Sequence, residues 1–266
     1  SVTVPRGIKQ IGYTCFYDCE NLSGELKIPD TVTYIGTGAF FSCGKISGDL
    51  KIPNSVTVIA PMAFAYCTSL SSLELGEGLY LLGDYAFCGC SGLSGSLRIP
   101  QGVAAVRSYT FAGCSGLNGT LDISGVTYIG EAAFASCKKL SGNLEFSDAL
   151  THIGAAAFEN CSSLSGELIL PESLNYIGDY AFNHCIGFTN ETLKIPRGIT
   201  VLGGDYKVSE NTDYGAHMFY DFGKDSFSAF EIQGSGKTEG TETENEGLFY
   251  AENGVLFSKS GRLIAY

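Results

Sequence analysis

The chain has 266 residues and a formal net charge of −12, with 28 acidic side chains against 16 basic ones. Nucleic-acid phosphates and anionic membrane surfaces both require clustered Lys and Arg, so this balance argues against either as a partner. No run of about 18 apolar residues predicts a membrane span, and no positively charged start followed by an apolar stretch predicts a signal peptide.

One unit is repeated along most of the chain, and residues Asp148 to Leu170 show it in full. Its landmarks are a Phe and, three residues later, a Cys, which recur every 23 or 24 residues. Self-similarity at this period is typical of a solenoid, in which each coil covers the apolar face of its neighbour. The Phe positions are Phe16, Phe40, Phe64, Phe87, Phe111, Phe134, Phe158 and Phe182, and the Cys positions are Cys19, Cys43, Cys67, Cys90, Cys114, Cys137, Cys161 and Cys185. We expect both columns to form structural ladders inside one continuous solenoid over residues 1–266, with eight regular repeats of 23–25 residues in 1–192.

Each repeat opens with a short Leu-x-Ile strand, such as Leu26-Lys27-Ile28. In six repeats Pro follows, and Pro ends a strand because it lacks an N–H group. We expect these strands to pair in parallel from one repeat to the next. The expected strand starts are Val2, Leu26, Leu50, Leu73, Leu97, Leu121, Leu144, Leu168 and Leu193.

The rest of a repeat predicts three further pieces. A second aliphatic pair such as Val32 and Ile35 predicts another short extended segment. Gly then follows at 12, 36, 83, 130, 154, 178 and 203, where we expect a tight or left-handed bend. The spacing of Ala, Phe and Cys in 133–137 favours a single helical turn with Phe and Cys inward. Ser-Gly pairs such as Ser141-Gly142 then return the chain to the next strand.

Ten cysteines would ordinarily suggest a disulfide framework, yet eight of them share one column. A parallel, in-register column aims its side chains alike, so we expect packed free thiols in preference to disulfides or a metal site. Cys15 and Cys88 lie outside the column. Cys15 replaces the Ala before Phe16, which predicts an interior position.

The pattern L-x-I-P-x-x-V-T-x-I-G-x-x-A-F-x-x-C resembles the BspA-type leucine-rich repeat, as in the run from Leu26 to Cys43. The resemblance implies a β-rich solenoid, namely a right-handed leucine-rich repeat superhelix with short parallel strands, a second extended segment and single helical turns. It also implies a bacterial protein that is secreted or displayed on the cell surface, and adhesion to host or matrix components.

The C-terminal part departs from the regular pattern. The ninth repeat carries an insertion at about 203–217, which is either a functional loop or a neutral lengthening. Residues 233–247 read as an acidic mobile loop, and 248–266 as a terminal hairpin similar to segments that punctuate BspA-type arrays. Since Val2 to Pro5 already match a strand end, we expect further residues upstream of this sequence, and the resemblance implies further repeats downstream.

No motif predicts catalysis or a cofactor. Gly234 to Thr238 resemble the end of a phosphate-binding loop, but Glu231 stands where that motif requires Gly and no apolar helix follows. His152 sits in a column with Tyr residues, His184 precedes a ladder Cys, and His217 lies in the insertion without metal-ligand spacing. We therefore expect no cofactor, no metal and no enzyme activity.

The strongest candidate for function is the strand face, which we define as the outward side of the Leu-x-Ile strands. Side chains beside the two inward aliphatics point away from the core because strand side chains alternate. Nine coils at about 4.8 Å would give a face of about 40 Å. The candidate ligand-binding residues are Glu25, Lys27, Asp49, Lys51, Glu74, Arg98, Asp122, Glu145 and Lys194.

Two functions fit these observations. The first is a non-catalytic module that binds a protein or glycan through the strand face. The second is a structural spacer that displays neighbouring domains of a larger surface protein, in which case the charges merely keep a sheet face solvated. The oligomeric state does not follow from the sequence.

Overall fold

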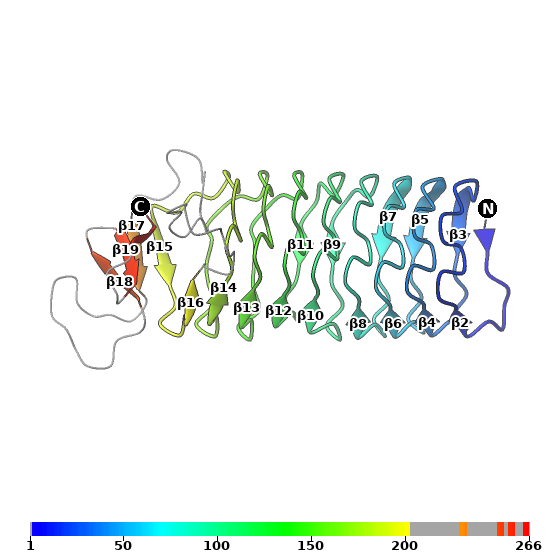
Figure 1. Cartoon of the computed structure of the whole chain (residues 1–266), viewed down its shortest axis with the longest axis horizontal. Coiled ribbons are helices and arrows are strands. Elements are labelled where there is room, and N and C mark those ends of the chain that lie inside the picture. Colours follow the sequence, from blue (N-terminus) through cyan, green and yellow to red (C-terminus); the bar gives the residue numbers. More distant parts are fainter. Residues whose placement is uncertain (1, 203–228, 233–248, 253–254, 259–262, 266) are drawn as a thin grey trace, which may run out of the picture.

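The computed structural model describes residues 2–202, 229–232, 249–252, 255–258 and 263–265. Successive coils lie side by side along the long axis, with the N-terminus at one end of the stack (Figure 1). The described chain is a parallel β-solenoid without α-helix, which confirms the expected fold class. The predicted insertion at 203–217, with His217, and the predicted acidic loop at 233–247 fall outside the described residues.

The strand face is built from Leu-x-Ile segments that pair in parallel with the next coil. Strands β1, β3, β5 and β7 form a four-stranded sheet, β9 pairs with β11, and β15 pairs with β17. The bounds are β1 (Val2–Thr3), β3 (Gly24–Lys27), β5 (Ile46–Lys51), β7 (Leu70–Glu74), β9 (Leu97–Arg98), β11 (Leu121–Asp122), β15 (Thr192–Ile195) and β17 (Ala229–Ile232).

The second extended segments form a second face of the solenoid. They pair in two parallel sheets, β2-β4-β6-β8 and β10-β12-β13-β14-β16. Their bounds are β2 (Gln10–Ile11), β4 (Tyr34–Ile35), β6 (Val58–Ile59), β8 (Leu81–Leu82), β10 (Ala105–Val106), β12 (Tyr128–Ile129), β13 (His152–Ile153), β14 (Tyr176–Ile177) and β16 (Val201–Leu202).

Near the C-terminus the direction of pairing changes. Strand β19 (Val255–Ser258) pairs antiparallel with β20 (Leu263–Ala265), and β18 (Phe249–Glu252) adds a third strand on the other side of β19. The two strands expected for the terminal hairpin are thus part of a three-stranded sheet.

The strand prediction was wrong in two coils. Leu144 to Phe146 and Leu168 to Leu170 form no strand, and the only pairing within these two described segments is an isolated bridge between Ile123 and Phe146. Phe146 stands where most repeats carry Ile. Its ring makes edge contacts with Phe158 of its own coil and Phe182 of the next. We attribute the interruption to this ring, which is too bulky for the flat spacing of a parallel ladder.

The segment that carries Phe and Cys is a run of tight turns, so the expected helical turn was wrong. In one coil, Ala133, Ala135 and Cys137 donate N–H bonds three residues back. The intervening N–H groups of Ala132 and Phe134 donate to the next coil instead. Left-handed residues make this alternation possible, two residues before and two after each Phe, as at Ala132 and Ser136 with φ of 49° and 62°. A helical turn would use every N–H within the coil and leave none for stacking.

The repeated shape of the coil requires its glycines for two different reasons. The glycines of the Ser-Gly pairs are left-handed, with φ of 81° to 84° at Gly48, Gly95 and Gly142. The glycine after the second segment is not left-handed; of the two expected bends it opens the tight one, as at Gly154, whose carbonyl oxygen accepts the N–H of Ala157. There a Cβ would meet backbone of the preceding coil, at 2.5 Å from the Glu131 nitrogen in the case of Gly154.

The Phe and Cys columns lie in the centre of the stack. Successive Phe rings from Phe16 to Phe182 are stacked with centroids 5.1–5.7 Å apart and planes within 12°. The rings from Phe40 onward are fully buried, as are the Cys side chains from Cys43 to Cys185. Phe16 and Cys19 are half-buried, because the first coil has a neighbour on one side only. For the same reason Cys15 is exposed and not interior as expected.

Candidate functional site

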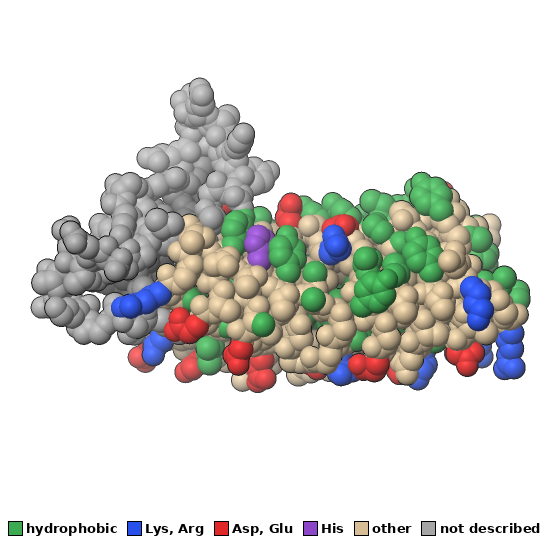
Figure 2. All heavy atoms as spheres, turned by 90° about the horizontal axis from the view of Figure 1, so that it is seen from below, with side chains coloured by type: hydrophobic (Ala, Val, Ile, Leu, Met, Phe, Trp, Pro, Cys, Tyr) green, Lys and Arg blue, Asp and Glu red, His purple; other side chains and the backbone are tan. Residues whose placement is uncertain are grey.

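The strand face presents most of the predicted residues together. Glu25 and Lys27 lie on β3, Asp49 and Lys51 on β5, and each of β7, β9, β11 and β15 contributes one residue. Eight of the nine candidates are exposed and Asp122 is half-buried. Charged side chains gather along one long edge of the molecule in Figure 2, whereas hydrophobic side chains are spread over the rest of that view. The residues contributed singly are Glu74, Arg98, Asp122 and Lys194, and Glu145 lies outside any strand.

The basic residues of the first coils are paired with carboxylates of the same face. Lys27 Nζ lies 3.1 Å from a Glu25 carboxylate oxygen, and Lys51 Nζ lies 2.9 Å from Glu74 Oε1 of the next coil. All four side chains are at least half exposed, so each pair contributes little stability in water. Because the pairs neutralise the Lys side chains, this part of the face is an alternating surface and not a basic one.

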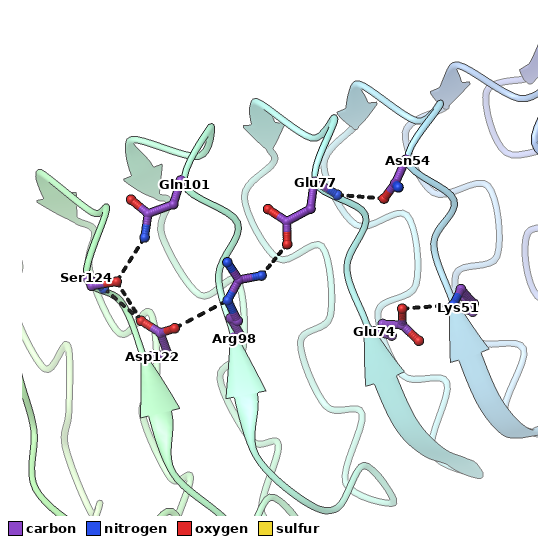
Figure 3. Close-up of polar contacts among 8 residues, drawn as sticks. All are labelled: Lys51, Asn54, Glu74, Glu77, Arg98, Gln101, Asp122 and Ser124. Atoms are coloured by element: carbon purple, nitrogen blue, oxygen red, sulfur yellow. Dashed lines mark hydrogen bonds and ion pairs between the residues drawn. The ribbon is translucent and has the colours of Figure 1, made fainter.

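A larger polar network crosses the middle coils (Figure 3). The Arg98 guanidinium binds the Glu77 carboxylate, and its Nε lies 3.4 Å from Asp122 Oδ2. Asp122 Oδ1 accepts hydrogen bonds from the hydroxyl and the backbone N–H of Ser124, at 2.8 and 3.1 Å. These two bonds, and then Arg98, hold the pKa of Asp122 below its usual value.

The same network includes residues that the sequence did not single out. Gln101 Nε2 donates to Ser124 Oγ at 2.9 Å, and the Glu77 N–H donates to Asn54 Oδ1 at 2.9 Å. All of these residues occupy the Pro position or follow it closely, where the chain leaves the strand. A comparison of that column across repeats would have found them, since Ser124 replaces Pro there.

The two last candidates are separate from this network. Glu145 and Lys194 have no ion pair with any residue in the part of the chain that the structure describes. Between them the strand face has no paired strands, and a second break in pairing separates β7 from β9.

The thiols of the Cys column are hydrogen-bond donors. Each Sγ from Cys43 to Cys185 donates to the carbonyl oxygen of the Phe in the preceding coil, at 2.9–3.2 Å. All ten cysteines are free. Burial raises the pKa of Cys43 to about 11 and that of Cys90, Cys137 and Cys185 to about 12. Such thiols stay protonated and are poor nucleophiles or metal ligands.

The histidines have structural surroundings. The His152 ring is stacked between Tyr128 and Tyr176 on the second face, with centroid distances of 4.4 and 4.0 Å. His184 occupies a left-handed turn position with φ of 57°. Within the described ranges no three His, Cys, Asp or Glu side chains are grouped to hold a metal ion.

A second exposed surface consists of aromatic side chains on the turns, next to the Phe column. Tyr17 stacks on Phe41 at 4.6 Å, and Phe41 meets Tyr66 edge to face at 5.5 Å. Tyr85 stacks on Tyr109 at 4.7 Å. Tyr17 and Tyr66 are each 49% exposed. The sequence already aligns these rings, because they occupy positions within two residues of a ladder Phe, but no motif marks them as a surface.

Comparison with known proteins identifies the class. The chain matches the family described as BspA type Leucine rich repeat region over residues 1–118 and 120–206, with six copies of the repeat. The protein therefore belongs to the BspA-type leucine-rich repeat family. This architecture is consistent with a protein-interaction module. No curated protein gives a significant match.

Solved structures of bacterial leucine-rich repeat proteins are similar. One from Eubacterium ventriosum is 18% identical with a TM-score of 0.51, covering 96% of this chain and 68% of that one. One from Bacteroides ovatus is 27% identical with a TM-score of 0.43, covering 85% of this chain and 65% of that one. A leucine-rich cell surface protein from Faecalibacterium prausnitzii is 20% identical with a TM-score of 0.44, and 88% of each chain is covered. This chain thus spans about two thirds of the first two proteins.

Among the described residues, no helix has the length and apolar character needed to cross a bilayer.

Proposed function

We propose that this protein is a non-catalytic interaction module that binds a protein or glycan through the strand face, as in adhesion to host or matrix components. The observation that carries the proposal is the polar network from Asn54 to Ser124, which fixes exposed charged side chains on neighbouring coils (Figure 3). A rigid surface loses little side-chain entropy when it binds, so such an arrangement favours recognition.

A binding role is favoured over catalysis by the chemistry of the side chains. The buried thiols are held protonated, and His152 is enclosed between two aromatic rings. The serine hydroxyls of the strand face donate to carboxylates, as Ser72 does to Asp49 and Ser124 to Asp122, and neither His152 nor His184 lies on that face to act as their base.

The family and the net charge support the proposed location and class of partner. Membership of the BspA-type family supports a secreted or surface-displayed protein. The net charge of −12 disfavours nucleic acid as the partner.

Charge reversal on the strand face tests the proposal. The triple variant Lys27→Glu, Lys51→Glu and Arg98→Glu replaces three paired cations, whereas Lys9→Glu, Lys138→Glu and Lys139→Glu makes the same charge change at exposed positions off that face. We expect immobilised wild-type protein and the second variant to retain purified matrix proteins or mucin glycans. The strand-face variant is expected to lose at least about tenfold in affinity.

The alternative is a spacer that displays neighbouring domains. It predicts no saturable binding to any of these probes, or equal binding by both variants. Either result would remove the strand face as a recognition surface.

A further inference from the structure

The interruption of the strand face leaves a groove between two coils. It lies where Leu144 to Phe146 and Leu168 to Leu170 fail to form strands, and it encloses about 400 Å³. A volume of this order accommodates one or two side chains of a bound peptide. The groove is therefore a local feature of the strand face, at the point where its strands are interrupted.

The groove carries uncompensated negative charge. Its lining includes the carboxylates of Glu145, Asp148 and Glu167 and no Lys or Arg. All three are exposed, and none has an ion pair with any residue for which the structure gives a position. This differs from the coils before it, where Lys27, Lys51 and Arg98 neutralise the acidic neighbours.

The groove also exposes apolar surface. Ile169 occupies the outward column that otherwise holds charged residues from Lys27 to Lys194, and it is 64% exposed. Phe146 and Pro171 are half-buried beside it. An isolated outward isoleucine on a charged sheet face adds nothing to folding, since it is left in water. Together with the carboxylates it forms a surface that is both acidic and apolar.

We propose that this groove binds an extended basic segment of a partner protein, in which Lys or Arg alternates with aliphatic residues. The cationic heads neutralise Glu145, Asp148 and Glu167, and an aliphatic side chain covers Ile169. Alternate residues of an extended chain point to opposite sides. The basic side chains of such a segment therefore point to one side of the groove and the aliphatic side chains to the other. The inference rests on the proposed function of the strand face and specifies its partner there as protein and not glycan.

Peptide binding to three variants tests this assignment. The probes are Lys-Leu-Lys-Leu-Lys, Lys-Ser-Lys-Ser-Lys and Glu-Leu-Glu-Leu-Glu, each with a fluorescent label and measured by anisotropy. The groove variant is Glu145→Gln, Asp148→Asn and Glu167→Gln. The matched variant Asp18→Asn, Glu20→Gln and Asp30→Asn removes the same charge from exposed sites at the other end of the stack. The third variant is Ile169→Ser.

We expect the Lys-Leu peptide to bind, with affinity falling as salt is raised. The groove variant should bind it about tenfold more weakly, and the matched variant less than about twofold. Ile169→Ser should weaken the Lys-Leu peptide about threefold or more and leave the Lys-Ser peptide unchanged. The Glu-Leu peptide should not bind.

Equal losses in the groove and matched variants would reduce the binding to general attraction by the net charge and would overturn the proposal. A second result would also overturn the proposal: the Lys-Leu peptide binds neither the wild type nor any variant, while a ligand of the strand face binds the groove variant with wild-type affinity. That last result would leave the proposed function of the strand face intact, because the variant with Lys27, Lys51 and Arg98 reversed tests it independently.

Discussion

The carbonyl oxygen of each ladder Phe from Phe16 to Phe158 accepts two hydrogen bonds. Phe111, for example, accepts the N–H of Cys114 within its own coil and the thiol of Cys137 from the next. A buried Ala or Val would fill the same column but could not donate the second bond. The hydrogen bond thus explains why the repeat carries Cys at this position when its thiol takes part in no disulfide.

Replacement of one ladder thiol should therefore cost stability. We expect Cys137→Ala to lower the free energy of unfolding by about 1–2 kcal/mol, because it removes buried volume and a donor together. Cys15→Ala, at an exposed position, should change it by less than about 0.5 kcal/mol. Urea denaturation followed by circular dichroism measures both. Equal midpoints for the two variants would show that the thiol bond is energetically neutral.

For individual residues, the sequence predicted the position of a side chain in the stack better than its hydrogen-bond or ion-pair partner. Period alone identified the Phe and Cys columns, since every coil repeats them. It could not identify the thiol acceptor, because the distance from Cys137 to Phe111 depends on how far one coil is offset from the next. For the same reason the pairing of Lys51 with Glu74 and of Arg98 with Glu77 did not follow from alternation of strand side chains.

Among the elements of a coil, the glycine after the second extended segment sets the spacing to its neighbour. A Cβ added at Gly154 or Gly178 would lie 2.5 or 2.3 Å from backbone nitrogen of the preceding coil, whereas one added at Gly12, in the first coil, would have nothing within 4 Å. The repeat therefore demands Gly for close approach between coils and not for its left-handed range.

The contrast between two of these glycines makes a matched test. Gly154→Ala should lower the free energy of unfolding by about 2 kcal/mol or more, because its methyl group would press on the Glu131 nitrogen and the Gly130 carbonyl carbon. Gly12→Ala should have an effect within about 0.5 kcal/mol. Thermal unfolding midpoints compare them directly. If Gly154→Ala is as stable as the wild type, the coils must shift as they do at Ala60, where the repeat itself carries a methyl group.

The elements that the sequence missed are those where long-range packing overrides local pattern. Leu144-Glu145-Phe146 alternates as a strand should, yet the Phe146 ring contacts Phe158 and Phe182 and only the single bridge to Ile123 forms. The Ala-Phe-Cys spacing suits a helical turn locally, but stacking takes alternate N–H groups for the next coil. The groove arises from the first of these departures, so no sequence motif predicted it.

At the scale of the whole molecule, small contributions to stability from each coil add up along the axis of the stack. Seven buried thiols, from Cys43 to Cys185, repeat the same environment, and burial raises the pKa of each above the ordinary value of 9.0. In a repeat protein such terms add through neighbouring coils, so a weak effect at one position becomes a property of the array.

Alkaline pH should therefore destabilise the stack. In the unfolded chain the thiols ionise near pH 9.0, whereas in the folded protein the raised pKa keeps Cys43 protonated to about 11 and Cys90 and Cys137 to about 12. Above pH 9 the unfolded state binds fewer protons than the folded state, so each thiol lowers the free energy of unfolding by up to about 1.4 kcal/mol per pH unit until its folded pKa is reached.

We expect the urea midpoint to change little from about pH 7 to 8.5 and to fall steeply above 9, with the thiol contribution ending near 12. The double variant Cys90→Ala and Cys137→Ala removes two of these groups and should show a shallower fall, although it is less stable at neutral pH. Ionisation of Tyr and Lys side chains acts on both proteins alike and cancels in the comparison. If the urea midpoint falls equally with pH in the two proteins, the ladder thiols ionise while the coils remain folded. That result would contradict the prediction.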